Sequence, residues 1–128
     1  MKISLLLQSA PSTQSHATAL RFARASLAAG HQIYRVFFYQ DACLAASTLN
    51  TPSQDETNNR SAWVELAKTH NIELIVCIAA ALKRGILDTQ EAKRYQKNQF
   101  NLEAPFELSG LGQLLDAQLN SDRFVSFA

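Results

Sequence analysis

The sequence predicts an α/β fold in which helices cover both faces of a mainly parallel central sheet of about five strands. Apolar, strand-like segments alternate along the chain with segments of helical periodicity. The strand-like segments are continuously apolar, as expected for strands that are buried on both faces. A length of 128 residues suits one hydrophobic core. We therefore expect residues 1–128 to form a single three-layer α/β/α domain.

The first third of the chain predicts a strand, a helix and a second strand. Lys2–Gln8 is a short apolar run that ends in SAPSTQS, a composition typical of a loop and a helix cap. His16–Ala29 has apolar residues at helical spacing, and Gly30 follows where a glycine commonly ends a helix. Gln32–Tyr39 is rich in β-branched and aromatic residues and predicts a strand.

The middle of the chain is less regular at first and then returns to the same alternation. A short helix is expected over Ala42–Ala46, followed by a polar surface loop that contains proline. Asn59–His70 has a helical pattern, Ile72–Cys77 is an apolar strand, and Ile78–Arg84 predicts a short helix.

The last third predicts two helices and a final strand. A polar helix is expected over Asp88–Gln96, whereas the segment that leads to Glu107 has no clear pattern. Gly110–Leu119 predicts a helix and Arg123–Phe127 a strand. The turn Ser109–Gly112 is interpreted in two ways, as an ordinary helix cap or as a set of backbone amides that border an anionic site.

Composition argues against several classes of protein. A net charge of +1 does not indicate a nucleic-acid-binding domain, and the pairs Lys83-Arg84 and Lys93-Arg94 are interpreted as solvated helix faces. The apolar run Ile3–Leu7 is shorter than the core of a secretion signal, and no stretch is long enough to span a membrane. Two distant cysteines, Cys43 and Cys77, do not form a disulfide framework, so we expect a reducing, cytoplasmic location.

Cys77 is the candidate functional residue because it lies where a predicted strand gives way to a predicted helix. In open parallel sheets, reacting groups gather beyond the carboxyl ends of the strands. A helix start stabilises a thiolate by about 0.3–1 kcal/mol, which activates a thiol only in part. Lys83 and Arg84 are the nearby cations in the sequence. We expect an accessible thiol there, and we interpret Cys43 as a packing residue.

The three histidines do not favour a cysteine-histidine hydrolase or a metal site. His16 follows the first loop and could reach the same edge of the sheet, but a packing role is favoured. His31 and His70 are interpreted as polar residues at helix ends. A thiol that only accepts and passes on a group needs no permanent base.

Two other classes of protein remain open on the residues alone. A flavodoxin-like flavin- or nucleotide-binding protein would use the loop Ser9–Ser15, although this loop has no glycine for a close approach of the backbone to phosphate. A noncatalytic assembly subunit would need Cys77 only for packing.

Four segments together resemble the TusD group of the DsrE-like family, and the likeness covers nearly the whole chain. They are VFFY at Val36–Tyr39, WVELA at Trp63–Ala67, VCIAAALKRGILD at Val76–Asp88, and the segment Phe106–Phe127. The first loop departs from the family pattern, because SAPSTQS stands where the family commonly has glycines and a tyrosine.

The resemblance implies a sulfurtransferase in which Cys77 carries sulfane sulfur as a persulfide. The sulfur would come from a TusA-like donor and pass to a TusE-like acceptor for 2-thiolation of the wobble uridine in tRNA. It also implies a heterohexamer with TusB-like and TusC-like subunits, with no metal or organic cofactor and no direct contact with nucleic acid. A DsrE-type subunit of a sulfur-oxidation pathway is the alternative within the family. The low charged fraction, 18%, fits a surface that other subunits partly cover.

Overall fold

The computed structural model describes residues 1–128 and contains one five-stranded sheet in which every strand pairing is parallel. The strand order across the sheet is β4-β3-β2-β1-β5. The strands are β1 (Lys2–Leu7), β2 (Gln32–Phe38), β3 (Glu73–Cys77), β4 (Phe106–Ser109) and β5 (Arg123–Phe127).

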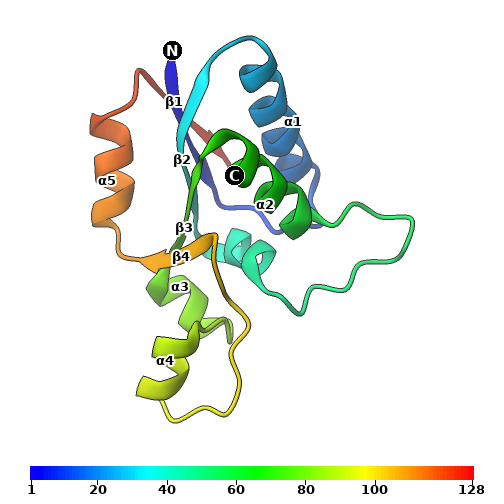
Figure 1. The fold of residues 1–128 in the computed structure, drawn as a ribbon, viewed down its shortest axis with the longest axis vertical. Coiled ribbons are helices and arrows are strands. Elements are labelled where there is room, and N and C mark those ends of the chain that lie inside the picture. Colours follow the sequence, from blue (N-terminus) through cyan, green and yellow to red (C-terminus); the bar gives the residue numbers. More distant parts are fainter.

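Helices lie on both faces of this sheet and beyond its carboxyl edge (Figure 1). α1 and α2 cover one face, and α5 covers the other, where it contacts β1, β2 and β5. The 3₁₀ helix η1 and the short helices α3 and α4 lie beyond the carboxyl ends of the strands. The helices are α1 (Gln14–Ala28), η1 (Gln40–Ala46), α2 (Asn59–His70), α3 (Ile78–Lys83), α4 (Thr89–Arg94) and α5 (Gly112–Leu119). The expected three-layer α/β/α architecture is therefore confirmed.

Helix ends follow the polar residues that flank them in the sequence. The side chain of Thr13 caps α1 by accepting a hydrogen bond from the backbone N–H of His16, and Asn58 caps α2 in the same way. Asn71 ends α2 in the left-handed conformation, with φ of 56°. None of these helices is long and apolar enough to cross a membrane.

Strand β4 is the one strand that the sequence pattern did not predict. It has four residues, of which only Phe106 is buried, so neither alternation nor a continuous apolar run identifies it. The strand exists because its backbone pairs with β3 at the edge of the sheet. The predicted helix over Gly110–Leu119 also begins two residues later, at Gly112.

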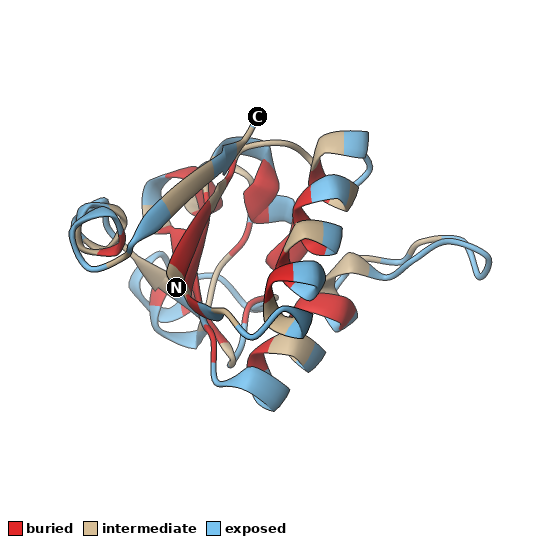
Figure 2. Ribbon diagram, turned by 90° about the horizontal axis from the view of Figure 1, so that it is seen from above, coloured by how far each residue is buried: buried red, intermediate tan, exposed pale blue.

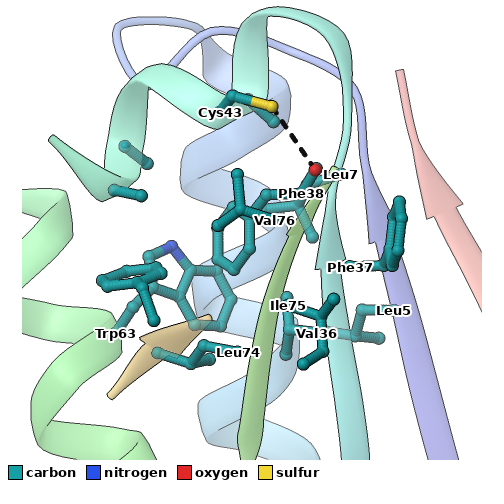
Figure 3. Packing of buried hydrophobic residues seen from close by; sticks show 14 of the residues in the cluster. Leu5, Leu7, Val36, Phe37, Phe38, Cys43, Trp63, Leu74, Ile75 and Val76 are labelled. Carbon is teal, nitrogen blue, oxygen red and sulfur yellow. Dashed lines mark hydrogen bonds between the residues drawn. The ribbon is translucent and has the colours of Figure 1, made fainter. Parts of the chain in front are cut away.

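Aromatic rings dominate the core between the sheet and the α1/α2 layer. Trp63 of α2 and Phe38 of β2 are both fully buried, and their ring centroids lie 5.7 Å apart in an edge-to-face arrangement. Phe106 of β4 packs on Phe38 at 5.5 Å. The buried residues gather on the sheet and on the inner sides of α1 and α2 (Figure 2), and Figure 3 shows Phe38 and Trp63 across β2 from Phe37.

The opposite face of the sheet is joined to α5 by a buried arginine. The side chain of Arg35 is 5% exposed and donates hydrogen bonds to Glu73 of β3, to Asp116 of α5 at 2.7 Å and to the backbone oxygen of Gln113 at 2.8 Å. A shift of register between β1 and β2 skips Tyr34, whose hydroxyl also reaches Asp116 at 2.8 Å. This bulge lets two successive residues of β2 reach the same helix.

Candidate functional site

Cys77 lies at the carboxyl end of β3, next to the central strand of the sheet. It is the last residue of the strand and the N-cap residue of α3, although its side chain does not cap that helix. Side chains alternate along a strand, so Cys77 shares a face with Ile75 and Glu73, and Glu73 is the partner of the arginine that contacts α5. The expected position at the junction of strand and helix is confirmed.

The expectation of an accessible thiol is wrong for the isolated chain. Cys77 is only 3% exposed and belongs to the main hydrophobic cluster. The 3₁₀ helix η1 packs against both β3 and α3, which closes the space above the strand end. A sulfur compound can therefore reach this thiol only when the β3–α3 junction or its cover moves.

Cys43 lies close to Cys77 although the two residues are far apart in the sequence. The Cys43 thiol is fully buried in η1 and donates a weak hydrogen bond to the backbone oxygen of Phe38, with a distance of 3.5 Å between sulfur and oxygen (Figure 3). Burial and, to a smaller extent, the neighbouring Cys77 together raise the pKa of Cys43 to about 12. Such a thiol is a poor nucleophile at neutral pH, which fits the packing role that the sequence predicted.

The two predicted cations near Cys77 have different surroundings. Arg84 forms an ion pair with Asp41 of η1 at 3.0 Å and donates a second hydrogen bond to the backbone oxygen of Ala80. Lys83 is exposed and forms no ion pair. The Arg84–Asp41 pair ties the end of α3 to η1, the same element that covers Cys77. Sequence reasoning missed Asp41, because nothing in the sequence links residues 43 positions apart.

His16 is a core residue rather than a base for the thiol. Its Nδ1 lies 3.1 Å from the backbone oxygen of Ser9, and its Nε2 accepts a hydrogen bond from the indole N–H of Trp63 at 3.0 Å. These partners fix the neutral tautomer with the proton on Nδ1. Burial lowers the pKa of His16, with the Ser9 hydrogen bond acting in the opposite direction. No lone pair is left to accept a proton from a thiol.

The turn that follows β4 adjoins the candidate site. Ser109 is the register partner of Cys77, so the sequence Ser109–Gly112 leaves the sheet directly beside it. A Cβ atom added to Gly110 or Gly112 would meet no atom within 4 Å, and neither residue has a positive φ. The fold of the chain itself therefore gives no reason for glycine at these two positions.

A surface cavity lies elsewhere on the carboxyl side of the molecule. It has a volume of about 530 Å³ and lies between the β1–α1 loop and the loop that precedes α2, and Cys77 does not line it. Its one charged lining residue is Glu56, so it offers no cation to a phosphate or a flavin phosphate group. No three His, Cys, Asp or Glu side chains lie close enough together to hold a metal ion.

Comparison with known proteins gives a consistent group of relatives. The model of the DsrE/DsrF-like family matches residues 1–127. The chain is 47% identical over 127 residues to a sulfurtransferase TusD homolog of Pseudomonas aeruginosa, covering 99% of this chain and 97% of that protein. It is 49% identical over 115 residues to sulfurtransferase TusD of Serratia proteamaculans, covering 90% and 89%.

Two further comparisons extend this group. The chain is 42% identical over 128 residues to the putative sulfurtransferase DsrE of Allochromatium vinosum, covering 99% of this chain and 98% of that one. Among solved structures, the ychN protein of E. coli matches with a TM-score of 0.77 at 22% identity, over 99% of both chains. This structural likeness supports the fold alone.

Proposed function

The chain belongs to the DsrE/DsrF-like family, and we propose that it is a sulfur-relay subunit in which Cys77 carries the sulfur as a persulfide. Relatives at 47–49% identity over most of their length are sulfurtransferases, and sulfurtransferase is the activity of this chain. The observation that supports Cys77 as the carrier is its place at the carboxyl end of β3, where parallel sheets gather reacting groups. Residues 1–128 act in this proposal as one sulfurtransferase domain.

The proposed reaction consists of two exchange steps with no net oxidation. The Cys77 thiolate attacks the outer sulfur of a donor persulfide, a new S–S bond forms, and the donor leaves as a thiolate. In the second step an acceptor thiolate attacks the outer sulfur of the Cys77 persulfide. Cys77 is then released as a thiolate, and the acceptor holds the sulfur.

Both steps require the buried thiol to become exposed. α3 has only six residues, and short elements with few buried contacts open at low free energy. The ion pair between Arg84 and Asp41 is the contact that such an opening would break at the η1 side. We propose that a partner shifts this junction when it binds, and that the closed chain shields the persulfide from water and small thiols.

The proposed partners follow from the same family relationship. The donor is a TusA-like protein, the acceptor a TusE-like protein, and the destination the 2-thiolated wobble uridine of tRNA in the cytoplasm. TusB-like and TusC-like subunits complete a heterohexamer. No residue of the chain is assigned to a metal or cofactor in this scheme.

A DsrE-type role in sulfur oxidation is the second candidate. It is supported by 42% identity over the full length to the putative sulfurtransferase DsrE, a value close to the identity with the TusD proteins. Deleting the gene and measuring 2-thiouridine in bulk tRNA separates the two roles. Loss of the thiolated nucleoside supports the relay to tRNA, and an unchanged level supports sulfur oxidation.

Mass spectrometry after loading with a persulfide donor tests the proposed carrier. We expect the added mass of one sulfur atom on the peptide that contains Cys77, no addition to Cys77→Ser, and normal loading of Cys43→Ala. Cys43→Ala is the matched control because that thiol is equally buried and lies nearby. If Cys77 stays unmodified in the assembled complex and reacts only after denaturation, the chain is an assembly subunit instead.

A further inference from the structure

A segment beside the candidate thiol has a positive net charge, whereas the rest of the chain has a negative one. This segment, called the basic lobe here, comprises residues 83–101, that is, the end of α3, helix α4 and the loop after it. It contains five of the 12 Lys and Arg residues but only two of the 11 acidic residues, and the other parts of the chain hold seven and nine. Of the two acids, Asp88 caps α4 and Glu91 is 4% exposed.

Three lysines of the basic lobe are free to meet a partner. Arg84 pairs with Asp41, and Arg94 lies 3.4 Å from the carboxylate of Glu91. Lys83, Lys93 and Lys97 are exposed and form no ion pair. Basic residues in the last turn of a helix complement its dipole, which explains Lys93 and Arg94 but not Lys97, which lies beyond the helix.

Two large aromatic side chains are exposed among these charges. Tyr95 is 52% exposed and Phe100 is 47% exposed, and neither ring pairs with another ring or a cation of the chain. Exposed aromatic residues are more frequent in protein interfaces than on other protein surfaces. The interpretation of Lys93-Arg94 as a solvated helix face does not account for these two exposed rings.

Hydrogen bonds order the backbone that carries these side chains. Gln96, which follows the C-cap residue Tyr95 of α4, has a φ of 57°, and the Lys97 N–H donates to the Ala92 oxygen at 2.8 Å. Together these features form a Schellman-type helix end. The Asn101 side chain accepts a hydrogen bond from the Leu87 N–H at 2.9 Å and donates one to the Gly85 oxygen at 3.2 Å. A surface ordered before binding loses less entropy when a partner docks.

The lobe lies within reach of a partner that also touches Cys77. α3 begins immediately after Cys77, and the part of it that precedes the lobe, Ile78–Leu82, spans only about 8 Å. A standard interface covers about 800 Å² on each protein, a patch roughly 30 Å across. One partner of ordinary size can therefore cover the lobe and reach the end of β3.

We propose that the basic lobe is the docking surface for a protein with an acidic face that exchanges sulfur with Cys77. This inference rests on the proposed function, since it names the chemistry of the partner that Cys77 serves. Three free lysines and two aromatic rings suit an acidic protein surface, whereas nucleic-acid-binding domains carry a larger basic excess. The partner's charge would bring its thiol to the carboxyl edge of the sheet at a higher rate.

Binding of a charged peptide tests the docking surface without any sulfur chemistry. The probes are a short fluorescein-labelled peptide rich in glutamate and its lysine counterpart, both without cysteine, measured by fluorescence anisotropy. We expect the glutamate peptide to bind at least about tenfold tighter at low salt, with the difference shrinking at high salt. The double variant Lys93→Glu with Lys97→Glu should reverse the preference. Its matched control, Arg21→Glu with Arg24→Glu on α1, should not, because those exposed cations lie outside the lobe.

Sulfur transfer from loaded Cys77 then separates the two proposals. With glutamate and lysine peptides that contain one cysteine, we expect faster transfer to the acidic peptide in the wild type and the reverse in the lobe variant. Free cysteine should accept sulfur equally from both proteins. If Cys77 takes up no sulfur at all, the proposed function fails, and the anisotropy measurement still decides the docking surface.

Several results would overturn the docking proposal. Equal affinity of the wild type for both peptides, or the same loss in the α1 control as in the lobe variant, removes the role of the lobe. Binding of a labelled single-stranded RNA that depends on Lys93 and Lys97, without binding of the acidic peptide, assigns the lobe to nucleic acid. Self-association lost in the lobe variant, again without peptide binding, assigns it to a second copy of the chain.

Discussion

Buried aromatic rings pack between the sheet and helices α1 and α2. On the other face, the guanidinium of Arg35 joins the sheet to α5, a helix with few buried residues. On the first side the indole N–H of Trp63 finds its partner inside the core, the Nε2 atom of His16. On the second side the partners of Arg35 are half exposed, with side chains of Glu73 and Asp116 at 51% and 41%. Ala117 is the one fully buried residue of α5.

This difference indicates that the α1/α2 side contributes more to the free energy of folding than the α5 side. Removing apolar surface from water is the main source of folding free energy, and the α1/α2 side does this with large rings. α5 and its N-cap residue instead expose a row of leucines at a spacing of four, Leu111, Leu115 and Leu119. By alternation along β3, Cys77 lies on the α5 side of the sheet, with Ile75 and Glu73.

Trp63→Ala should have the largest effect and sets the scale of the comparison. Removing this fully buried ring should lower the free energy of unfolding by about 3–5 kcal/mol, because a cavity forms among Phe38 and His16. Urea unfolding followed by circular dichroism measures it, with Leu49→Ala as the surface control, since Leu49 is 73% exposed. A loss below about 1 kcal/mol would mean that the aromatic side does not dominate stability.

Arg35→Ala should cost less than the loss of the tryptophan. We expect about 1–3 kcal/mol, because the half-exposed Glu73 and Asp116 can return to water while the Gln113 oxygen loses its donor. Arg35→Met keeps the packing of the stem and should recover part of the loss. The same urea titration gives the result. A cost equal to that of Trp63→Ala would remove the distinction between the two sides.

The sequence predicted the parts of this molecule that local pattern decides. The strand Arg123–Phe127 and the helix Asn59–His70 have the expected bounds, because continuous apolar runs and helical periodicity are properties of adjacent residues. β4 was missed because its four residues become a strand only by pairing with β3. The strand before Cys77 and the helix after it, in contrast, were predicted from their own local patterns.

The burial of Cys77 could not be predicted, for a related reason. It depends on η1, which follows β2 and returns to cover the end of β3. The contact between Asp41 and Arg84 and the closeness of the two thiols arise from the same packing. The spacing of residues along the chain does not reveal these contacts. The sequence could therefore predict the position of Cys77 at the edge of the sheet but not its burial.

Lowering the pH should weaken the α1/α2 side before the α5 side. Burial lowers the pKa of His16 in the folded state, so below about pH 6.5 the unfolded chain binds a proton that the folded chain does not. Stability is therefore fully present above that pH and falls as the pH decreases, by at most about 1.4 kcal/mol per pH unit. Urea midpoints at pH 7.5 and 5.5 measure the effect. His16→Gln should reduce this pH dependence.

The α5 side should respond only at lower pH. Hydrogen bonds from Tyr34 and Arg35 lower the pKa of Asp116, so its contribution is present above the ordinary carboxyl range and is lost as the pH falls through its folded pKa. In Asp116→Asn the stability change between pH 7.5 and 5.5 should match the wild type. If Asp116→Asn instead reduced this pH dependence as much as His16→Gln does, the separation of the two sides would be contradicted.

Asp41→Asn should have the smallest effect, and it is seen in thiol reactivity rather than in stability. The Arg84–Asp41 pair is largely exposed on the aspartate side, at 61%, and such pairs are worth about 0.2–1 kcal/mol. If the opening that exposes Cys77 breaks this pair, its loss should raise the rate of alkylation of Cys77 by iodoacetamide about 1.5- to 5-fold.

The measurement uses Cys43→Ala as background so that only one thiol reacts. Glu56→Gln, which removes a carboxylate in no ion pair, is the control. An unchanged rate in Asp41→Asn would place the opening elsewhere, at the turn Ser109–Gly112 beside Cys77, and the Arg84–Asp41 contact would then be a packing feature of η1 alone.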